Sequence, residues 1–334
     1  MRQVGQREIA FKCLYGGRQG WGHIVRCSAL AAAFRESGWK TTLWSENADE
    51  PLPDFAAKEF DEVTKTMPRE AEVLLVDEMY TKDSEFDWLR QDWESVSSSA
   101  RLFIGIDDMQ QRSMGSFDLA INCELGLESA VYRSKHALLG ERFALLRKGI
   151  GEPEPVNDWE LPRGSIPVLV MIGGTDAYRY TDRALNSLFD WRGDEVVPIV
   201  VYGASSENRI RVMNTIGRFR RSRFLERIDA SQLAGWMAFC SFAVVACGST
   251  LYELAAANLP FLGISLVDNQ TAFARKVADI WEQPVVFREG MHHLPLNISY
   301  ELDLLLERGR VPYSNVDTEG ADRVRRKIEE LLAS

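Results

Sequence analysis

The chain has 334 residues, of which 46% are hydrophobic and 26% charged, and its formal net charge is -10. This composition is typical of an ordinary globular enzyme, and the negative charge argues against broad binding to a nucleic-acid backbone. Five cysteines without CxxC spacing indicate neither a disulfide framework nor a zinc site. The N-terminus lacks an apolar signal core and the longest apolar stretch, residues 236–247, is too short to span a bilayer, so we expect a cytoplasmic protein.

The length predicts two domains of about 150 residues each, because one hydrophobic core rarely organises a longer chain. Short apolar runs alternate with helical patterns in the first half. Strands are expected at residues 9–15, 41–44, 73–76, 102–106 and 119–122. Helices are expected at residues 23–36 and 84–94. A segment rich in Gly, Pro and charge, residues 149–155, then marks the boundary between a domain at 1–150 and a domain at 151–334.

The second half repeats the alternation. Strands are expected at residues 168–172, 196–201, 242–246, 260–265 and 285–287. Helices are expected at residues 180–189, 209–216, 231–238, 250–257, 271–281 and 321–332. The final helix carries an apolar stripe and is expected to pack near the domain junction. The fold class is therefore α/β, with two Rossmann-type domains facing each other across a cleft.

The segment around Gly248, Ser249 and Thr250 is the most informative in the chain. It ends an apolar run and opens a helical pattern, which places free backbone N–H groups and a helix N-terminus where a phosphate could bind. Glu253 falls one turn later, where a carboxylate could accept hydrogen bonds from a ribose diol. The pattern predicts a nucleotide diphosphate site.

Glycine-rich turns follow two other predicted strands, at residues 16–23 and 173–176. The carboxyl ends of parallel strands are where open sheets bind ligands, so three such turns favour a shared cleft. The alternative for each turn is that its glycines simply make a tight strand-to-helix connection. Trp21, between two glycines, is a candidate platform for a sugar or base.

His23 is the candidate catalytic residue, because histidine is scarce and this one opens a helix after a glycine turn. The helix dipole disfavours the imidazolium form there, so a neutral ring able to accept a proton is expected. The alternative is a histidine that caps its helix or packs beside Arg26. We interpret His292 and His293, in a predicted loop, as an exposed pair rather than a metal site. Charged residues after strands are expected in solvated turns or helix caps: Asp107, Asp108, Arg112 and Asp118.

Seven motifs together carry a resemblance to a known family. In chain order they are Gly20-Trp21-Gly22-His23-Ile24-Val25-Arg26-Cys27, Val76-Asp77 with Tyr80, Ile106-Asp107-Asp108, Leu139-Gly140 with Ala144-Leu145-Leu146-Arg147, Gly173-Gly174-Thr175-Asp176, Gly248-Ser249-Thr250 with Glu253, and Asp268-Asn269-Gln270. They resemble UDP-2,4-diacetamido-2,4,6-trideoxy-altropyranose hydrolase of the pseudaminic acid pathway, whose relatives include a spore coat polysaccharide protein. This family is similar to the two-domain glycosyltransferases of the GT-B fold.

The resemblance implies a role for each matching residue. His23 would activate water at the anomeric carbon and Tyr80 would lie near the sugar, although its spacing from Asp77 is one residue longer than is usual in the family. The remaining residues implied to bind substrate are Gly20, Gly22, Gly173, Gly174, Thr175, Gly248, Ser249, Thr250, Glu253, Asn269 and Gln270. Such an enzyme releases UDP and free sugar from a UDP-linked amino or deoxy sugar, and it needs neither a metal nor another cofactor.

One departure concerns the first strand, where the family has Arg-x-Asp and this chain has Lys12, Cys13 and Leu14. The positive charge is kept but the carboxylate is replaced by an apolar side chain. If the family carboxylate orients the catalytic group or contacts the sugar, its loss implies a different sugar or transfer of the sugar to something other than water. The alternatives to a hydrolase are an inverting glycosyltransferase that uses His23 on an acceptor hydroxyl, and a non-catalytic nucleotide-sugar-binding protein.

Overall fold

The computed structural model describes residues 6–16, 21–78, 82–108, 110, 112–130, 132–157, 159–172, 176, 179–203, 206–287, 298–310, 312–313 and 315–334. The chain divides into two compact units. Unit 1 comprises Met1–Lys148 and Asp317–Ser334, and unit 2 comprises Gly149–Val316. Among the helices in these ranges, none has both the length and the apolar composition that crossing a bilayer requires.

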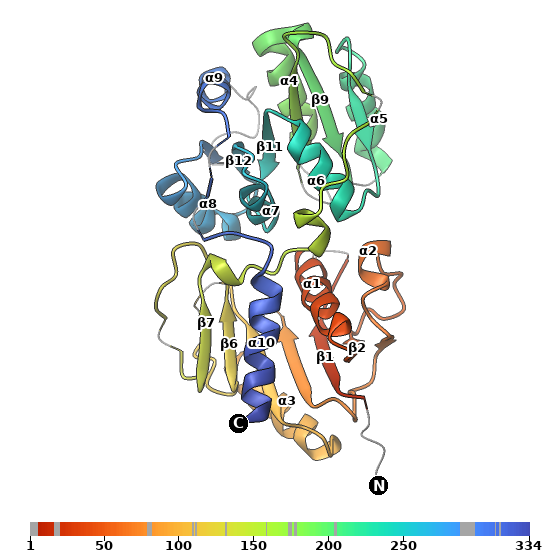
Figure 1. Cartoon of the computed structure of the whole chain (residues 1–334), viewed down its shortest axis with the longest axis vertical. Helices are drawn as coiled ribbons and strands as arrows, with labels where there is room; N and C mark the ends of the chain where they lie inside the picture. Colours follow the sequence, from red (N-terminus) through yellow and green to blue (C-terminus); the bar gives the residue numbers. More distant parts are fainter. Residues whose placement is uncertain are drawn as a thin grey trace. The chain divides into compact units, whose positions relative to one another are not determined.

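Unit 1 is built, in its described part, on one sheet of seven parallel strands. In spatial order these are β3 (Glu62–Thr64), β2 (Lys40–Trp44), β1 (Glu8–Cys13), β4 (Val73–Asp77), β5 (Leu102–Ile106), β6 (Leu119–Asn122) and β7 (His136–Leu139). The helices are α1 (Gly22–Glu36), the short α2 (Asp54–Ala57), α3 (Asp83–Val96) and α10 (Gly320–Ala333) (Figure 1). The strand order reverses between β1 and β4, the position at which doubly wound sheets bind ligands.

Alternating residues of the central strands divide the core of unit 1 into two layers. Ile9 and Phe11 of β1 pack with the buried faces of α1 and α10. Ala10, on the opposite face of β1, packs with Phe86 and Trp93 of α3. Side chains of successive strand residues point to opposite faces, so a strand buried on both sides needs an apolar run such as residues 9–11 of β1.

The final helix belongs to unit 1, whereas the expected division places it in the second domain. Val324, Ile328 and Leu332 lie on one stripe of α10 and are buried against the core around α1. Trp39 also donates from Nε1 to Glu329 Oε1 at 3.2 Å. An amphipathic stripe shows that a helix packs, but not on which sheet, so the sequence alone could not make this assignment.

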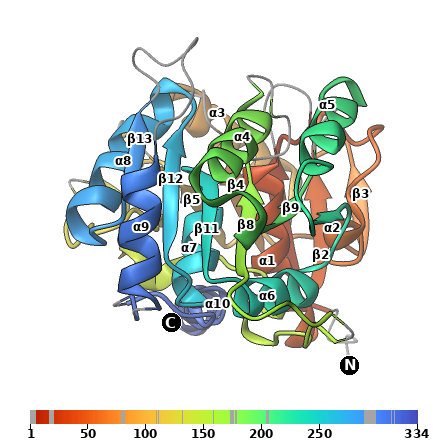
Figure 2. The same ribbon diagram turned by 90° about the horizontal axis from the view of Figure 1, so that it is seen from above.

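Unit 2 contains a sheet of six parallel strands in its described residues. In spatial order these are β10 (Arg223–Leu225), β9 (Val196–Val201), β8 (Ile166–Met171), β11 (Phe242–Ala246), β12 (Phe261–Ser265) and β13 (Val285–Phe287), and Figure 2 shows them following one another from β13 to β9. The helices are α4 (Tyr180–Arg192), α5 (Ser206–Ile216), α6 (Ala230–Phe239), α7 (Thr250–Ala256), α8 (Asp268–Ile280) and α9 (Ser299–Arg308). The α/β class expected from the sequence is confirmed, and in this sheet the order reverses between β8 and β11.

Gly320, the first residue of α10, provides a test of how tightly this helix is seated. A Cβ added there would lie 2.1 Å from the backbone oxygen of Ala144, so either the start of α10 or the backbone at Ala144 must move. We expect Gly320→Ala to lower the free energy of unfolding by about 1–3 kcal/mol, measured by urea denaturation.

Gly22→Ala is the matched control, because Gly22 also opens a helix and an added Cβ there meets nothing within 4 Å. Alanine at that position should leave stability unchanged or raise it by up to about 1 kcal/mol. Equal effects of the two substitutions would show that the close contact with Ala144 is unimportant.

Candidate functional site

The reversal of strand order in unit 1 brings together residues from two strands and one helix. Cys13 ends β1 and Asp77 ends β4, and the two residues are paired in register. His23 is the second residue of α1, the helix that follows β1. The topology therefore places His23 and Asp77 at the same carboxyl edge, although 54 residues separate them in sequence.

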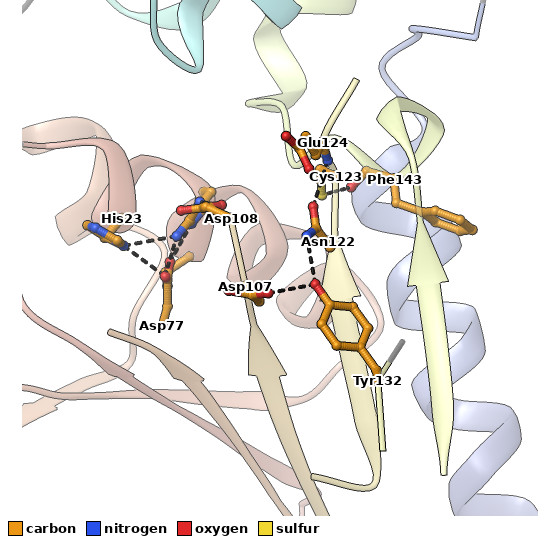
Figure 3. A network of polar contacts seen from close by, with 11 residues as sticks. His23, Asp77, Asp107, Asp108, Asn122, Cys123, Glu124, Tyr132 and Phe143 are labelled. Atoms are coloured by element: carbon orange, nitrogen blue, oxygen red, sulfur yellow. Dashed lines mark hydrogen bonds and ion pairs between the residues drawn. The ribbon is translucent and has the colours of Figure 1, made fainter. Parts of the chain in front are cut away.

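His23, Asp77 and Arg26 form one hydrogen-bonded cluster (Figure 3 labels the first two). His23 Nδ1 lies 2.8 Å from Asp77 Oδ1, and Arg26 Nε donates to Asp77 Oδ2 at 2.5 Å. A second Arg26 nitrogen, Nη2, also donates to Asp77 Oδ1, which completes a two-armed contact between guanidinium and carboxylate. Arg26 Nη1 donates to Asp108 Oδ1 at 2.6 Å.

Asp77 carries its charge in this cluster although it is only 1% exposed. Burial by itself would raise the pKa of this carboxyl, but the adjacent Arg26 guanidinium and His23 hold it well below its usual range. An ionised carboxylate has no proton to donate, so the 2.8 Å contact places the proton on His23 Nδ1. Arg26 Nη2, which lies 3.0 Å from the same nitrogen, can also only donate, so its proton goes to Asp77 Oδ1 rather than to the ring. We assign His23 this tautomer on that ground.

The other ring nitrogen, Nε2, carries the lone pair in this tautomer. It has no hydrogen-bond partner among the residues that the structure describes. The residue is 8% exposed. A histidine whose Nδ1–H is fixed by a carboxylate and whose Nε2 is uncommitted has the arrangement of a general base.

A second polar group follows β5 and β6 in the same unit (Figure 3). Tyr132 donates its hydroxyl to Asp107 Oδ2 at 2.6 Å and accepts from Asn122 Nδ2 at 2.7 Å. Burial raises the pKa of Tyr132 well above its ordinary value, so the phenol stays protonated and acts as the donor to Asp107.

The expectation of solvated turns or helix caps is wrong for Asp107, which follows β5, and for Asp118, which directly precedes β6. Asp107 and Asp118 are each only 4% exposed. Asp118 accepts from the Phe103 backbone N–H at 3.0 Å and pairs with Arg90 and Lys135. Buried carboxylates need such partners, and a single sequence does not show that they are available.

Lys12 lies at the end of β1, where the family has arginine. Its Nζ is 2.9 Å from Glu78 Oε1 and 3.8 Å from Glu46 Oε1, and it lies over the Trp44 ring at 4.5 Å from the centroid. The residue is 8% exposed. The retained positive charge is therefore balanced by carboxylates within unit 1.

The predicted phosphate-binding segment of unit 2 follows β11 at the corresponding reversal of strand order. Leu251 N donates to Gly248 O at 3.0 Å and Tyr252 N donates to Ser249 O at 3.1 Å, so the turn winds directly into α7. Ser249 is exposed, and a Cβ added to Gly248 would meet nothing within 4 Å. Glu253 is 4% exposed and lies in the first turn of this helix.

Comparison with known proteins extends the description. No family model matches the chain. The spore coat polysaccharide biosynthesis protein SpsG of Bacillus subtilis (strain 168) is 24% identical to it. The alignment is 346 positions long and covers 95% of this chain and 96% of SpsG. The crystal structure of Acinetobacter baumannii MurG is similar with a TM-score of 0.57 and 11% identity, covering 96% of this chain and 95% of MurG. The chain is similar to SpsG along nearly its whole length and has a GT-B fold.

Two further structures share this fold. Spinosyn rhamnosyltransferase SpnG, complexed with thymidine diphosphate, has a TM-score of 0.56 at 11% identity, covering 97% of this chain and 96% of SpnG. A putative UDP-N-acetylglucosamine 2-epimerase from Listeria monocytogenes has a TM-score of 0.54 at 12% identity, covering 98% of this chain and 97% of the other. The GT-B-like fold expected from the motifs is thus confirmed. The more specific likeness to the altropyranose hydrolases stays a prediction.

The structure describes some of the remaining predicted site residues and not others. Gly22 opens α1. Gln270 lies in α8, and its Oε1 accepts from the Leu266 backbone N–H at 2.8 Å, which ties this side chain to the turn before the helix. Asn269 is in the same helix, and its contact with a sugar stays a prediction. Outside the described residues lie Gly20, Tyr80, Gly173, Gly174, Thr175, His292 and His293.

Sequence reasoning missed the partners of His23. Asp77 appeared only as part of a motif, Arg26 only as a possible packing neighbour, and Asp108 as a solvated turn residue. The available signal for Arg26 was its position three residues after His23, on the same helical face. Among the described residues, no group of three or more His, Cys, Asp or Glu side chains is arranged to hold a metal ion.

Proposed function

We propose that the protein is a nucleotide-sugar hydrolase in which His23 acts as general base. The observation that carries the proposal is the contact of His23 Nδ1 with the ionised Asp77, which leaves Nε2 as the acceptor. The similarity to SpsG and the GT-B fold support a nucleotide sugar as the substrate class. SpnG, which shares the fold, is complexed with thymidine diphosphate.

In the proposed reaction His23 acts as the base toward a bound nucleotide sugar. Water attacks the anomeric carbon while His23 Nε2 takes its proton, and the bond between that carbon and the diphosphate oxygen breaks. UDP leaves with the electron pair of the broken bond. Backbone N–H groups and hydroxyls at Gly248, Ser249 and Thr250 stabilise the charge that develops on the diphosphate, and Glu253 accepts from the ribose.

An inverting glycosyltransferase is the second candidate, with an acceptor hydroxyl in place of water. It is favoured by the glycosyltransferase-like fold and by the loss of the carboxylate of the family Arg-x-Asp at Leu14. The same base and the same nucleotide site would serve both reactions. They differ in the nucleophile that the site admits.

The test begins by identifying the nucleotide and then follows its products. In a thermal shift panel of UDP, TDP, CDP and GDP, we expect UDP to raise the melting temperature most. A nucleotide present at about 100 times its Kd stabilises the folded state by about 2.7 kcal/mol. A panel of UDP-linked amino and deoxy sugars is then incubated with the protein in buffer alone, and products are separated by anion exchange and mass spectrometry.

A hydrolase releases UDP and free sugar in stoichiometric amounts without any acceptor. A transferase releases UDP rapidly only when an acceptor is added, and the sugar then appears bound to that acceptor. Absence of turnover with every nucleotide sugar, despite UDP binding, would contradict the enzyme assignment and leave a nucleotide-sugar-binding protein.

A further inference from the structure

Arg26 contacts both members of the His23–Asp77 pair. Its Nε and Nη2 atoms donate to the two oxygens of Asp77, and Nη2 also lies 3.0 Å from His23 Nδ1. The third guanidinium nitrogen, Nη1, donates to Asp108. The Arg26 side chain is 19% exposed, so its charge is only weakly screened by water.

Few other charges face the pair in the described part of the chain. Cys27, on α1, donates from Sγ to Asp77 Oδ2 at 3.6 Å, and burial raises the pKa of its thiol, so Cys27 is neutral. Burial likewise raises the pKa of Cys123, which follows β6, to about 12. Cys13, in register with Asp77 on β1, is buried. In the described residues, the charged group in hydrogen-bond contact with the pair is thus the guanidinium of Arg26, which in turn contacts the carboxylate of Asp108, whose side chain is 46% exposed.

A histidine–carboxylate pair can bind one additional proton in two ways. The proton can form an imidazolium beside a carboxylate, or it can form a carboxylic acid that donates to Nδ1 of a ring protonated at Nε2. In both forms Nε2 has lost its lone pair, and the pair titrates as one unit. A positive charge within hydrogen-bond distance opposes both forms, because each adds a proton to a site that already faces a cation.

We propose that Arg26 is a positioning residue that keeps the His23–Asp77 pair from binding an additional proton, and so keeps Nε2 of His23 available as an acceptor. The inference rests on the proposed function for its catalytic consequence, since His23 must be the base. The physical claim concerns the protonation of the pair and can be measured without turnover.

Asp108 has the opposite influence on the pair. Its carboxylate partly offsets the guanidinium charge at Nη1. Removing it strengthens the positive potential at Asp77 and His23 and makes the additional proton less favourable. The effect of Asp108 on the pair is smaller than that of Arg26, because its carboxylate contacts Arg26 rather than the pair and is half exposed to water. The two substitutions therefore predict shifts of opposite sign.

The test uses Arg26→Met, which removes the charge and keeps most of the side-chain volume. We expect the acid limb of the kcat/KM profile to move upward by about one pH unit or more, because loss of a cation in contact with the pair favours the additional proton. A shift of one pH unit lowers the rate about tenfold on the acidic side of the profile. Asp108→Asn should move the limb downward by less. Arg26→Lys, which keeps the charge, should shift it less than Arg26→Met.

Arg35→Met is the matched control, because Arg35 lies on the same helix, its side chain is 38% exposed, and it pairs with Glu59 rather than with the cluster. It should leave the profile unchanged. An equal shift in Arg35→Met and Arg26→Met would overturn the proposal, as would equal shifts in Arg26→Lys and Arg26→Met.

Nitrogen-15 NMR of the histidine rings gives a readout that does not need substrate. The His23 signals are assigned by their loss in His23→Gln, and their titration midpoint should rise in Arg26→Met and fall slightly in Asp108→Asn. An unchanged midpoint in both variants overturns the inference even if His23→Ala abolishes turnover. Conversely, normal turnover of His23→Ala overturns the proposed function while the NMR midpoints still decide the role of Arg26. If Arg26→Met does not fold, as judged by circular dichroism, Asp108→Asn and Arg26→Lys decide the sign.

Discussion

His23→Ala should lower kcat by about 10²–10⁴-fold, the contribution expected of a general base. The substitution removes the only acceptor that the proposed mechanism assigns to the proton of the attacking nucleophile. Affinity for UDP should be unchanged, because the nucleotide is assigned to residues of unit 2 whereas His23 belongs to unit 1. The measurements are UDP release under saturating substrate and the thermal shift produced by UDP.

His136→Ala is the control for this experiment. His136 opens β7 of the same unit and is exposed, so its loss removes a histidine without touching the cluster. Turnover should be the same as in the unsubstituted protein. Normal turnover in His23→Ala would contradict the assignment of the base, and loss of UDP binding in that variant would contradict the separation of roles between the units.

The strongly apolar elements of the fold could be predicted from the sequence because their pattern is local. The strands Leu102–Ile106 and Phe242–Ala246 have the expected bounds, and both are continuous apolar runs buried on two faces. The short strands Glu62–Thr64, His136–Leu139 and Arg223–Leu225 were not predicted. Each is partly exposed and has only three or four residues, so its extended form depends on pairing with a neighbouring strand rather than on its own composition.

Buried side chains outside the apolar strands were harder to predict than those within them. Trp21, considered as a platform for a ligand, packs partly buried against the core of unit 1. Asp107 directly follows β5 and Asp118 directly precedes β6, positions that usually indicate a solvated turn, yet both are buried with partners. The partners come from positions 15 to 28 residues away, and only the folded sheet brings them together.

His23 shows both what the sequence could predict about the site and what it could not. His23 could be singled out because histidine is rare and glycines precede its helix. Its geometry depends on Asp77, which is on another strand, and on Arg26, whose orientation follows from that carboxylate. A sequence pattern thus indicated which residue could do chemistry, but the tautomer that makes the chemistry possible is set by tertiary contacts.

Asp77→Asn should lower kcat by about 10²–10⁴-fold while leaving the shape of the side chain almost unchanged. The amide replaces one of two acceptor oxygens by a donor. Arg26 donates to both oxygens, so either orientation of the amide sets its NH₂ group against a guanidinium N–H. The orientation that keeps the Arg26 Nε bond turns the NH₂ group toward His23 Nδ1, which then has to accept and moves the ring proton to Nε2.

The result is a protein that binds UDP but holds its base in the wrong tautomer. Nitrogen-15 shifts of the His23 ring report that change directly, since the protonated and unprotonated ring nitrogens differ, and kcat is measured on the same preparation. Asp108→Asn is the matched control, because it also replaces an acidic partner of Arg26 by its amide but leaves the contact between His23 and Asp77 in place. Activity of Asp77→Asn within about tenfold of the unsubstituted protein, with Nδ1 still protonated, would show that Asp77 does not set the tautomer. Loss of activity with the original tautomer retained would instead assign the effect to the missing negative charge beside the developing imidazolium.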